Sequence, residues 1–100
     1  MAEDDRSRGN GDGDTRIDPR TAAAKAADYV DAMTGMPPEV VTAVEPQEDG
    51  WLVEVEVLEL ARVPATTDIL ACYAVELDAR GAPRSYRRIR RYHRARVGEE

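Results

Sequence analysis

Hydrophobic residues first recur at helical spacing between residues 19 and 34. One stripe of such a helix would comprise Ala22, Ala26, Tyr29, Val30 and Met33. Asp18 is a good N-cap, and Pro19 suits the first helical position, where a missing N–H costs nothing. Gly35 supplies a left-handed C-terminal residue, and the prolines at 37–38 prevent continuation. The pattern therefore predicts a helix over residues 19–34.

After residue 38 the hydrophobic period changes from about 3.6 to about 2, which is typical of strands. Residues 39–45 form a short strand, and residues 47–50 form a turn that ends in glycine. The next strand has one buried face, made by Trp51, Val53, Val55 and Val57. The alternation slips at residues 57–58, where a β-bulge is expected. The inward face of a third strand comprises Ile69, Ala71, Tyr73, Val75 and Leu77.

The last segment of the pattern allows two interpretations. Asp78 and Gly81 occupy the first and fourth positions of a turn, which predicts a type I turn with a glycine bulge. Beyond it, Tyr86, Ile89 and Tyr92 fit a helical stripe. A strand would instead place on one face Tyr86, Arg88, Arg90 and Tyr92. Because the hairpin turn delivers the chain antiparallel to the third strand, we predict a strand over residues 84–93, with a helix as the alternative.

Together these elements predict an α+β domain over residues 19–96, in which one N-terminal helix packs on a four-stranded antiparallel β-meander. Residues 1–18 contain six acids, three arginines and three glycines, with Ile17 the only sizeable hydrophobic residue after Met1. Such a segment buries too little apolar surface to offset its ordering entropy. We predict a disordered acidic tail, for which an arm that contacts a basic partner is the functional alternative.

Charge is sorted sharply along the chain. Residues 80–96 contain eight arginines and no acid, whereas residues 39–78 contain ten carboxylates and one base, Arg62. The net charge of −6 and the pI of about 4.8 argue against a general nucleic-acid-binding protein, although a local basic strip could still act. Such a separation of opposite charges along the chain affects association and the choice of partner more directly than it affects the fold.

Candidate chemistry is sparse. The single cysteine, Cys72, excludes an internal disulfide and a cysteine-built zinc site, and no apolar run reaches membrane-spanning length. His93 stands without a nucleophile beside it and is interpreted as solvated. Glu54 and Glu56 lie about 7 Å apart on a strand and are interpreted as a solvated face rather than a glycosidase pair. Trp51 is interpreted as a cover of the core. We expect no enzyme, no cofactor, no metal and no membrane contact, in a soluble cytoplasmic protein.

Several pieces of the chain follow one another in a specific order. They are Gly50 and Trp51 at a strand start, residues 55–59, the turn at 62–66, residues 68–78, the Gly81 turn and residues 86–94. Over roughly residues 20–95 this order resembles the GvpO family of gas vesicle accessory proteins. Cys72 stands where an aliphatic residue would be ordinary, and the acidic tail lies outside the resemblance.

The resemblance implies a role in making gas vesicles, the hollow protein-walled buoyancy organelles in the cytoplasm of some bacteria and archaea. It implies an assembly factor or minor vesicle component whose partners are other gas vesicle proteins, and a cytoplasmic, vesicle-associated location. Composition independently argues against a wall subunit, because one surface of a wall must resist water and this chain is 34% charged.

The arginine strip has three interpretations. It can pair with Glu54, Glu56 and Glu76 across neighbouring strands, where each opposite-charge pair contributes roughly 0.2–1 kcal/mol. It can bind nucleic acid, which would make the chain a regulator of gas vesicle gene expression, although the neighbouring glutamates would repel phosphate. The leading interpretation is a protein interface, because tyrosine and arginine are favoured anchors. Its candidate residues are Tyr86, Arg88, Arg90, Arg91, Tyr92 and Arg94.

Overall fold

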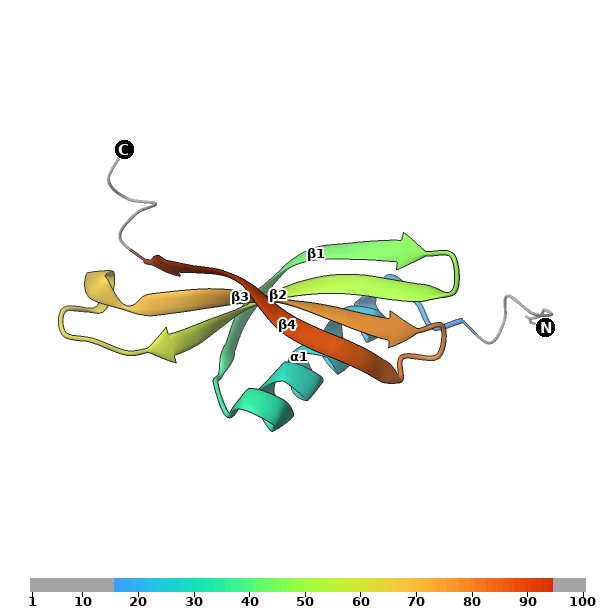
Figure 1. Ribbon diagram of the computed structural model, residues 1–100, viewed down its shortest axis with the longest axis horizontal. Helices are drawn as coiled ribbons and strands as arrows, with labels where there is room; N and C mark the ends of the chain where they lie inside the picture. The colour runs from blue at the N-terminus through green and yellow to red at the C-terminus, as the bar shows by residue number, and fades with distance from the viewer. Residues whose placement is uncertain (1–15, 95–100) are drawn as a thin grey trace.

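The computed structural model describes residues 16–94 and shows one helix on one face of an antiparallel sheet (Figure 1). The elements are α1 (Pro19–Thr34), β1 (Pro38–Gln47), β2 (Gly50–Leu60), the short 3₁₀ turn η2 (Ala65–Thr67), β3 (Ile69–Asp78) and β4 (Pro83–His93). The sheet order is β1-β2-β3-β4, a simple meander. The predicted architecture is confirmed, and the arginine segment is a strand rather than a helix.

Helix α1 has the boundaries that its capping residues predict. The Asp18 carboxylate accepts a hydrogen bond from the Thr21 N–H at 2.8 Å, which satisfies one of the free donors of the first turn. Gly35 ends the helix with φ 73°, and its N–H donates to the Asp31 carbonyl. Of the predicted apolar stripe, the buried members are Ala22, Ala26 and Val30. Met33 is instead 51% exposed, so the stripe is narrower than predicted.

The core lies between α1 and one face of the sheet. It is built from alternate residues of the two central strands, namely Trp51, Val53, Val55, Val57, Ala71, Tyr73, Val75 and Leu77. The alternation predicted from the sequence is confirmed at each of these positions. Trp51 is 5% exposed, with the Arg16 guanidinium stacked 4.9 Å from its ring centroid, so its interpretation as part of the core is confirmed.

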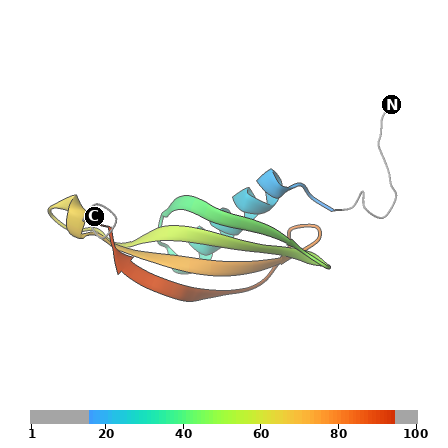
Figure 2. The same ribbon diagram turned by 90° about the horizontal axis from the view of Figure 1, so that it is seen from above.

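No helix in residues 16–94 covers the opposite face of the sheet (Figure 2). Three small or apolar residues on that face of β3 are nevertheless buried, namely Leu70, Cys72 and Ala74. Side chains from β2 and β4 extend over them. The β2–β3 hairpin also projects beyond the end of α1, which leaves the far end of the sheet without a helix on either face (Figures 1 and 2).

Several β-bulges interrupt the pairing of the strands. The register shifts leave an extra residue at Glu39 and Thr42 on β1, at Glu59 on β2, and at Arg84 and Ile89 on β4. The bulge predicted at residues 57–58 is present, but it lies at Glu59. Val57 and Leu58 still alternate regularly, because Leu58 pairs with Leu70 on the open face.

Contacts with the sheet begin before α1. The Ile17 N–H donates to the Ala79 carbonyl at 2.9 Å, and its side chain packs against the core. Arg16 donates to the carbonyls of Gln47 and Gly50. These two residues, assigned to the tail from composition, therefore belong to the folded domain. An apolar residue directly before a helix N-cap is a known helix-start signal that could have revealed Ile17. The rest of the predicted tail, residues 1–15, lies outside the described residues.

The β3–β4 turn has the predicted form. The Gly81 N–H donates to the Asp78 carbonyl at 3.0 Å, and Gly81 adopts φ 93°. The Asp78 carboxylate accepts hydrogen bonds from the N–H groups of Arg80 and Ala82, both at 2.9 Å. This turn directs the chain back along β3 and so positions the arginine strip.

Gly50 is the glycine whose substitution should disturb the fold most. A Cβ there would clash with the Leu77 carbonyl, whereas a Cβ at Gly35 would meet open space. We expect Gly50→Ala to lower the free energy of unfolding by more than about 2 kcal/mol. We expect Gly35→Ala to lower it by only about 1 kcal/mol, because alanine is strained in the left-handed backbone conformation of this residue. Urea unfolding of both variants measures the difference, and equal losses would contradict this close approach.

The Asp78 turn should make the stability of the fold depend on pH in the acidic range. Hydrogen bonds from the Ala82 and Arg80 N–H groups lower the pKa of the Asp78 carboxyl. Its contribution is therefore complete above the unfolded pKa of about 4 and is lost as the pH falls through the lower folded pKa. We expect Asp78→Asn, which keeps the acceptor oxygen, to flatten the loss of thermal stability below about pH 4. An unchanged acid slope would contradict this assignment.

Candidate functional site

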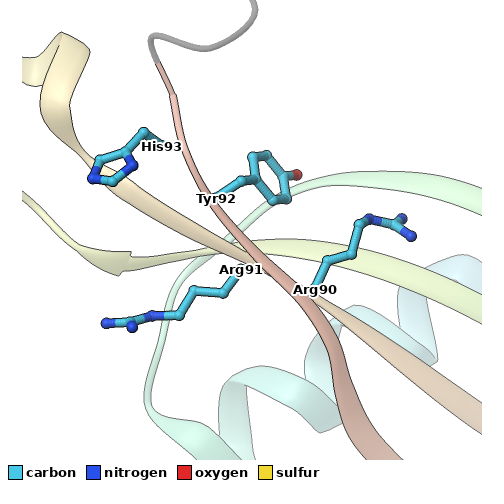
Figure 3. A pocket seen from close by; sticks show the side chains of 4 residues that line it. All are labelled: Arg90, Arg91, Tyr92 and His93. Atoms are coloured by element: carbon cyan, nitrogen blue, oxygen red, sulfur yellow. The ribbon is translucent and has the colours of Figure 1, made fainter.

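The candidate interface residues lie on two faces of β4. The bulge at Ile89 reverses the alternation, so that Arg88 pairs with Tyr73 and Arg90 pairs with Cys72. Figure 3 shows Arg90 and Tyr92 pointing to one side of the strand and Arg91 and His93 to the other. The prediction that Tyr86, Arg88, Arg90 and Tyr92 share one face of the strand is therefore wrong. Arg90 and Tyr92 lie on the open face, while Tyr86, Arg88 and Arg91 lie on the helix side.

Tyr86 belongs largely to the core. Its ring packs edge-on against Tyr29 with centroids 5.5 Å apart, and lies 5.9 Å from the ring of Tyr73. Aromatic pairs of this kind contribute about 0.5–1.5 kcal/mol beyond the area they bury. Tyr86 is thus only partly available to a partner, and the exposed character of β4 comes mainly from its arginines.

On the open face, β4 reaches β2 across the small side chain of Cys72. The Arg90 guanidinium lies 3.3 Å from the Glu54 carboxylate and 3.5 Å from the Cys72 sulfur. Beside it, the Tyr92 hydroxyl donates to the Glu56 carboxylate. Burial and this hydrogen bond raise the pKa of the Tyr92 phenol well above its ordinary value. Burial also raises the pKa of Cys72, so both groups remain protonated at neutral pH.

On the helix side, two arginines share one carboxylate beyond the end of α1. Arg88 lies 3.3 Å and Arg91 3.2 Å from the Glu59 side chain. Glu59 is the bulge residue of β2, and a bulge can redirect a side chain toward a distant partner. One negative charge thus faces two positive ones, which leaves an excess of positive charge at this end of the sheet.

Arg94 ties the end of β4 to two other segments. Its guanidinium lies 3.1 Å from Asp68 and 3.3 Å from Glu39, and its backbone N–H donates to the Asp68 carbonyl at 2.9 Å. The hydrogen bonds to Glu39 and Asp68 raise the pKa of Arg94. Asp68 is 5% exposed and also accepts from the Arg62 N–H. Arg94 therefore has a clear structural role beside its predicted one.

The expected pairing of the strip with β2 and β3 is only partly right. Glu54 pairs with Arg90, but Glu56 binds the tyrosine hydroxyl and exposed Glu76 lies opposite Ser85. Between residues 16 and 94, Glu76 makes no ion pair. Arg84 pairs instead with Asp49 at 3.3 Å. The sequence pattern missed Glu59, Asp68, Glu39 and Asp49, because bulges and loops bring them to β4.

Little else in the described region suggests chemistry. Residues 90–93 line an open depression of about 580 Å³ along β4. Within residues 16–94, no cluster of three or more His, Cys, Asp or Glu side chains is placed to hold a metal ion. The helix in that range is neither long enough nor apolar enough to cross a membrane. The candidate site is therefore the cationic surface and edge of β4.

Glu59 should matter more to stability than Glu76. We expect Glu59→Gln to lower the free energy of unfolding by up to about 1 kcal/mol, because two arginines lose their common partner. The control Glu76→Gln should change it by less than about 0.5 kcal/mol. Chemical denaturation of both variants gives the comparison. A larger effect at Glu76 would contradict the ion pairing described above.

Comparison with known proteins supports the resemblance seen in the sequence. The family model of the gas vesicle synthesis protein GvpO matches residues 5–98. Gas vesicle protein O of a Streptomyces species is 54% identical over 77 residues, which are 77% of this chain and 57% of that protein. Gas vesicle protein O of Haloferax mediterranei is 42% identical over 52 residues, 52% of this chain and 37% of that protein.

A third relative, gas vesicle protein O1 of Halobacterium salinarum, is 39% identical over 56 residues, 56% of this chain and 47% of that protein. The chain thus spans 57% or less of the length of these three relatives. No solved structure matches it. Because the family model covers the whole described domain, this chain belongs to the gas vesicle synthesis protein GvpO family.

Proposed function

We propose that this protein supports the formation of gas vesicles in the cytoplasm by binding another gas vesicle protein through the arginines of β4. The observation that carries the proposal is the position of these cations. They line one edge of a chain whose net charge is −6, so the molecule offers an acidic partner one attractive side.

Internal ion pairs do not consume this binding capacity. A guanidinium has five N–H donors, and a single carboxylate takes no more than two of them. Arg90 is 57% exposed and Arg91 is 53% exposed while paired. Arg87 is exposed and makes no ion pair between residues 16 and 94. The pairs therefore hold the arginines in place and leave donors for a partner, which lowers the entropy lost on binding.

A protein partner fits this surface better than nucleic acid does. Glu54 and Glu56 lie beside Arg90 on the open face, and their charges would repel the unbroken row of phosphates of a nucleic acid. An acidic protein segment can place its carboxylates opposite the arginines and uncharged residues opposite these glutamates. Tyr92, a candidate for base stacking, is half-buried and bound to Glu56. The open sheet face is charged, which also suits an accessory role rather than that of a wall subunit, whose surface must resist water.

A charge swap tests whether the location of the cation matters. Arg90→Glu combined with Glu54→Arg keeps the ion pair and the net charge, but moves the cation from β4 to β2. We expect the free energy of unfolding to change by less than about 1 kcal/mol. We also expect capture of gas vesicle proteins to fail, along with vesicle formation in cells that lack their own family member, since like charges at an interface cost several kcal/mol.

Two single substitutions that change the net charge by the same amount provide a matched control. Arg87→Glu changes β4, whereas Arg20→Glu makes the same charge change on the exposed start of α1. The first variant should impair vesicle formation, and the second should leave it intact. Normal vesicles and retained partners with folded Arg87→Glu and charge-swap proteins would overturn the proposal. Tight RNA or DNA binding that weakens steeply with salt would favour the regulator instead.

A further inference from the structure

We propose that the outer edge of β4 binds an acidic, extended segment of the protein partner as a fifth strand of the sheet. This inference rests on the proposed function and specifies how the contact is made. Addition of a strand to an exposed sheet edge gives affinity through backbone hydrogen bonds, while side chains on alternate positions give specificity.

The backbone of β4 offers its hydrogen-bonding groups along this edge. β4 is the last strand of the sheet, and in residues 16–94 no further strand pairs with it. The Arg94 N–H points toward β3, because it donates to the Asp68 carbonyl. Register is regular from His93 to Arg90, and residues of an antiparallel strand alternate between facing the partner strand and facing away. The N–H and C=O groups of Arg91 and His93 therefore face outward.

The other edge of the sheet is poorly suited to the same role. β1 carries Pro38 and Pro46, which lack N–H donors, and bulges at Glu39 and Thr42 that disturb its regularity. Prolines and bulges are common ways to protect an edge strand from pairing. β4 also has two bulges, at Arg84 and Ile89, but its one proline, Pro83, is its first residue, so every residue from Arg90 to His93 has an N–H group. Its regular stretch coincides with the depression lined by residues 90–93.

Charge selects the kind of strand that can be added. Arg90 lies on one side of the edge and Arg91 on the other (Figure 3). Carboxylates on either face of an added strand would therefore meet a guanidinium, forming opposite-charge cross-strand pairs. A second copy of β4 would bring arginines against arginines, and like charges directly opposite each other are destabilising. The occupant is thus an acidic segment of another protein rather than the same strand of a second molecule.

Amide hydrogen exchange on the full chain tests the geometry directly. The probe is a synthetic peptide of alternating glutamate and valine, and its control is the same peptide with every amide N-methylated. We expect the first peptide to slow exchange at Arg91 and His93 while leaving Arg20 unchanged. The N-methylated peptide keeps the charge, but it has no N–H donors and its methyl groups prevent close approach of its carbonyls to the β4 backbone, so it should protect neither residue.

A substitution at one position separates backbone pairing from side-chain contact. His93→Pro removes an outward N–H and no arginine, and proline is tolerated at such edge positions. His93→Ala removes only the side chain. We expect the proline variant to bind the peptide roughly three- to tenfold more weakly than the alanine variant, the size of one lost backbone hydrogen bond. Circular dichroism confirms that both fold, and the exchange experiment on the unmodified chain needs neither variant.

Several outcomes would overturn strand addition. Equal protection by the N-methylated peptide, or by a single-stranded RNA of the same charge, would mean that any polyanion suffices. Slow exchange at Arg91 and His93 in the protein alone would mean that the edge is already occupied. The charge variants could abolish vesicles while His93→Pro forms them normally and binds the peptide as tightly as His93→Ala does. That result would support the proposed function and contradict strand addition.

Discussion

The arrangement of the cationic strand β4 depends on charged side chains that cross the sheet from β2 to β4 over small residues of β3. Strands that flank a common neighbour lie about 10 Å apart, a distance that Glu and Arg side chains span together. They meet because Cys72 offers little bulk beneath the Arg90–Glu54 pair. On the helix side, Arg91 lies opposite Ala71 and reaches Glu59. A larger residue on β3 would force these charged side chains apart. On the face that lacks a helix, Arg90, Glu54, Tyr92 and Glu56 extend over β3, where Leu70, Cys72 and Ala74 are buried.

Bulges determine where these charges point. Glu39, Glu59 and Arg84 are each the extra residue of a register shift, and each forms an ion pair with another segment. A regular strand would place them in strict alternation, whereas a bulge rotates the side chain and increases the local twist. The individual pairs are partly exposed and contribute little stability. Their larger effect is to hold the arginines of β4 in defined positions, which is the preorganisation that the proposed binding of an acidic partner requires.

The two edges of the sheet differ in a way that suits directional association. Both edge strands have two bulges, but β1 carries prolines at Pro38 and Pro46, whereas β4 is regular and free of proline between Arg90 and His93 and is flanked by cations. Repulsion between arginines discourages pairing of two identical edges. Many proteins use charged residues on edge strands for the same purpose.

The sequence alone determined the helix, the four strands, the central turn residues and the buried alternation from Trp51 to Leu77, because these depend on local periodicity and capping. It also located the cationic strip, which is a property of composition. Only the tertiary structure decided how that strip is used. The bulge at Ile89 divided it between two faces, Tyr86 entered the core, and loops and bulges brought Glu59 and Asp68 to the arginines. Register and bulge positions depend on contacts between distant strands, and no local pattern contains them.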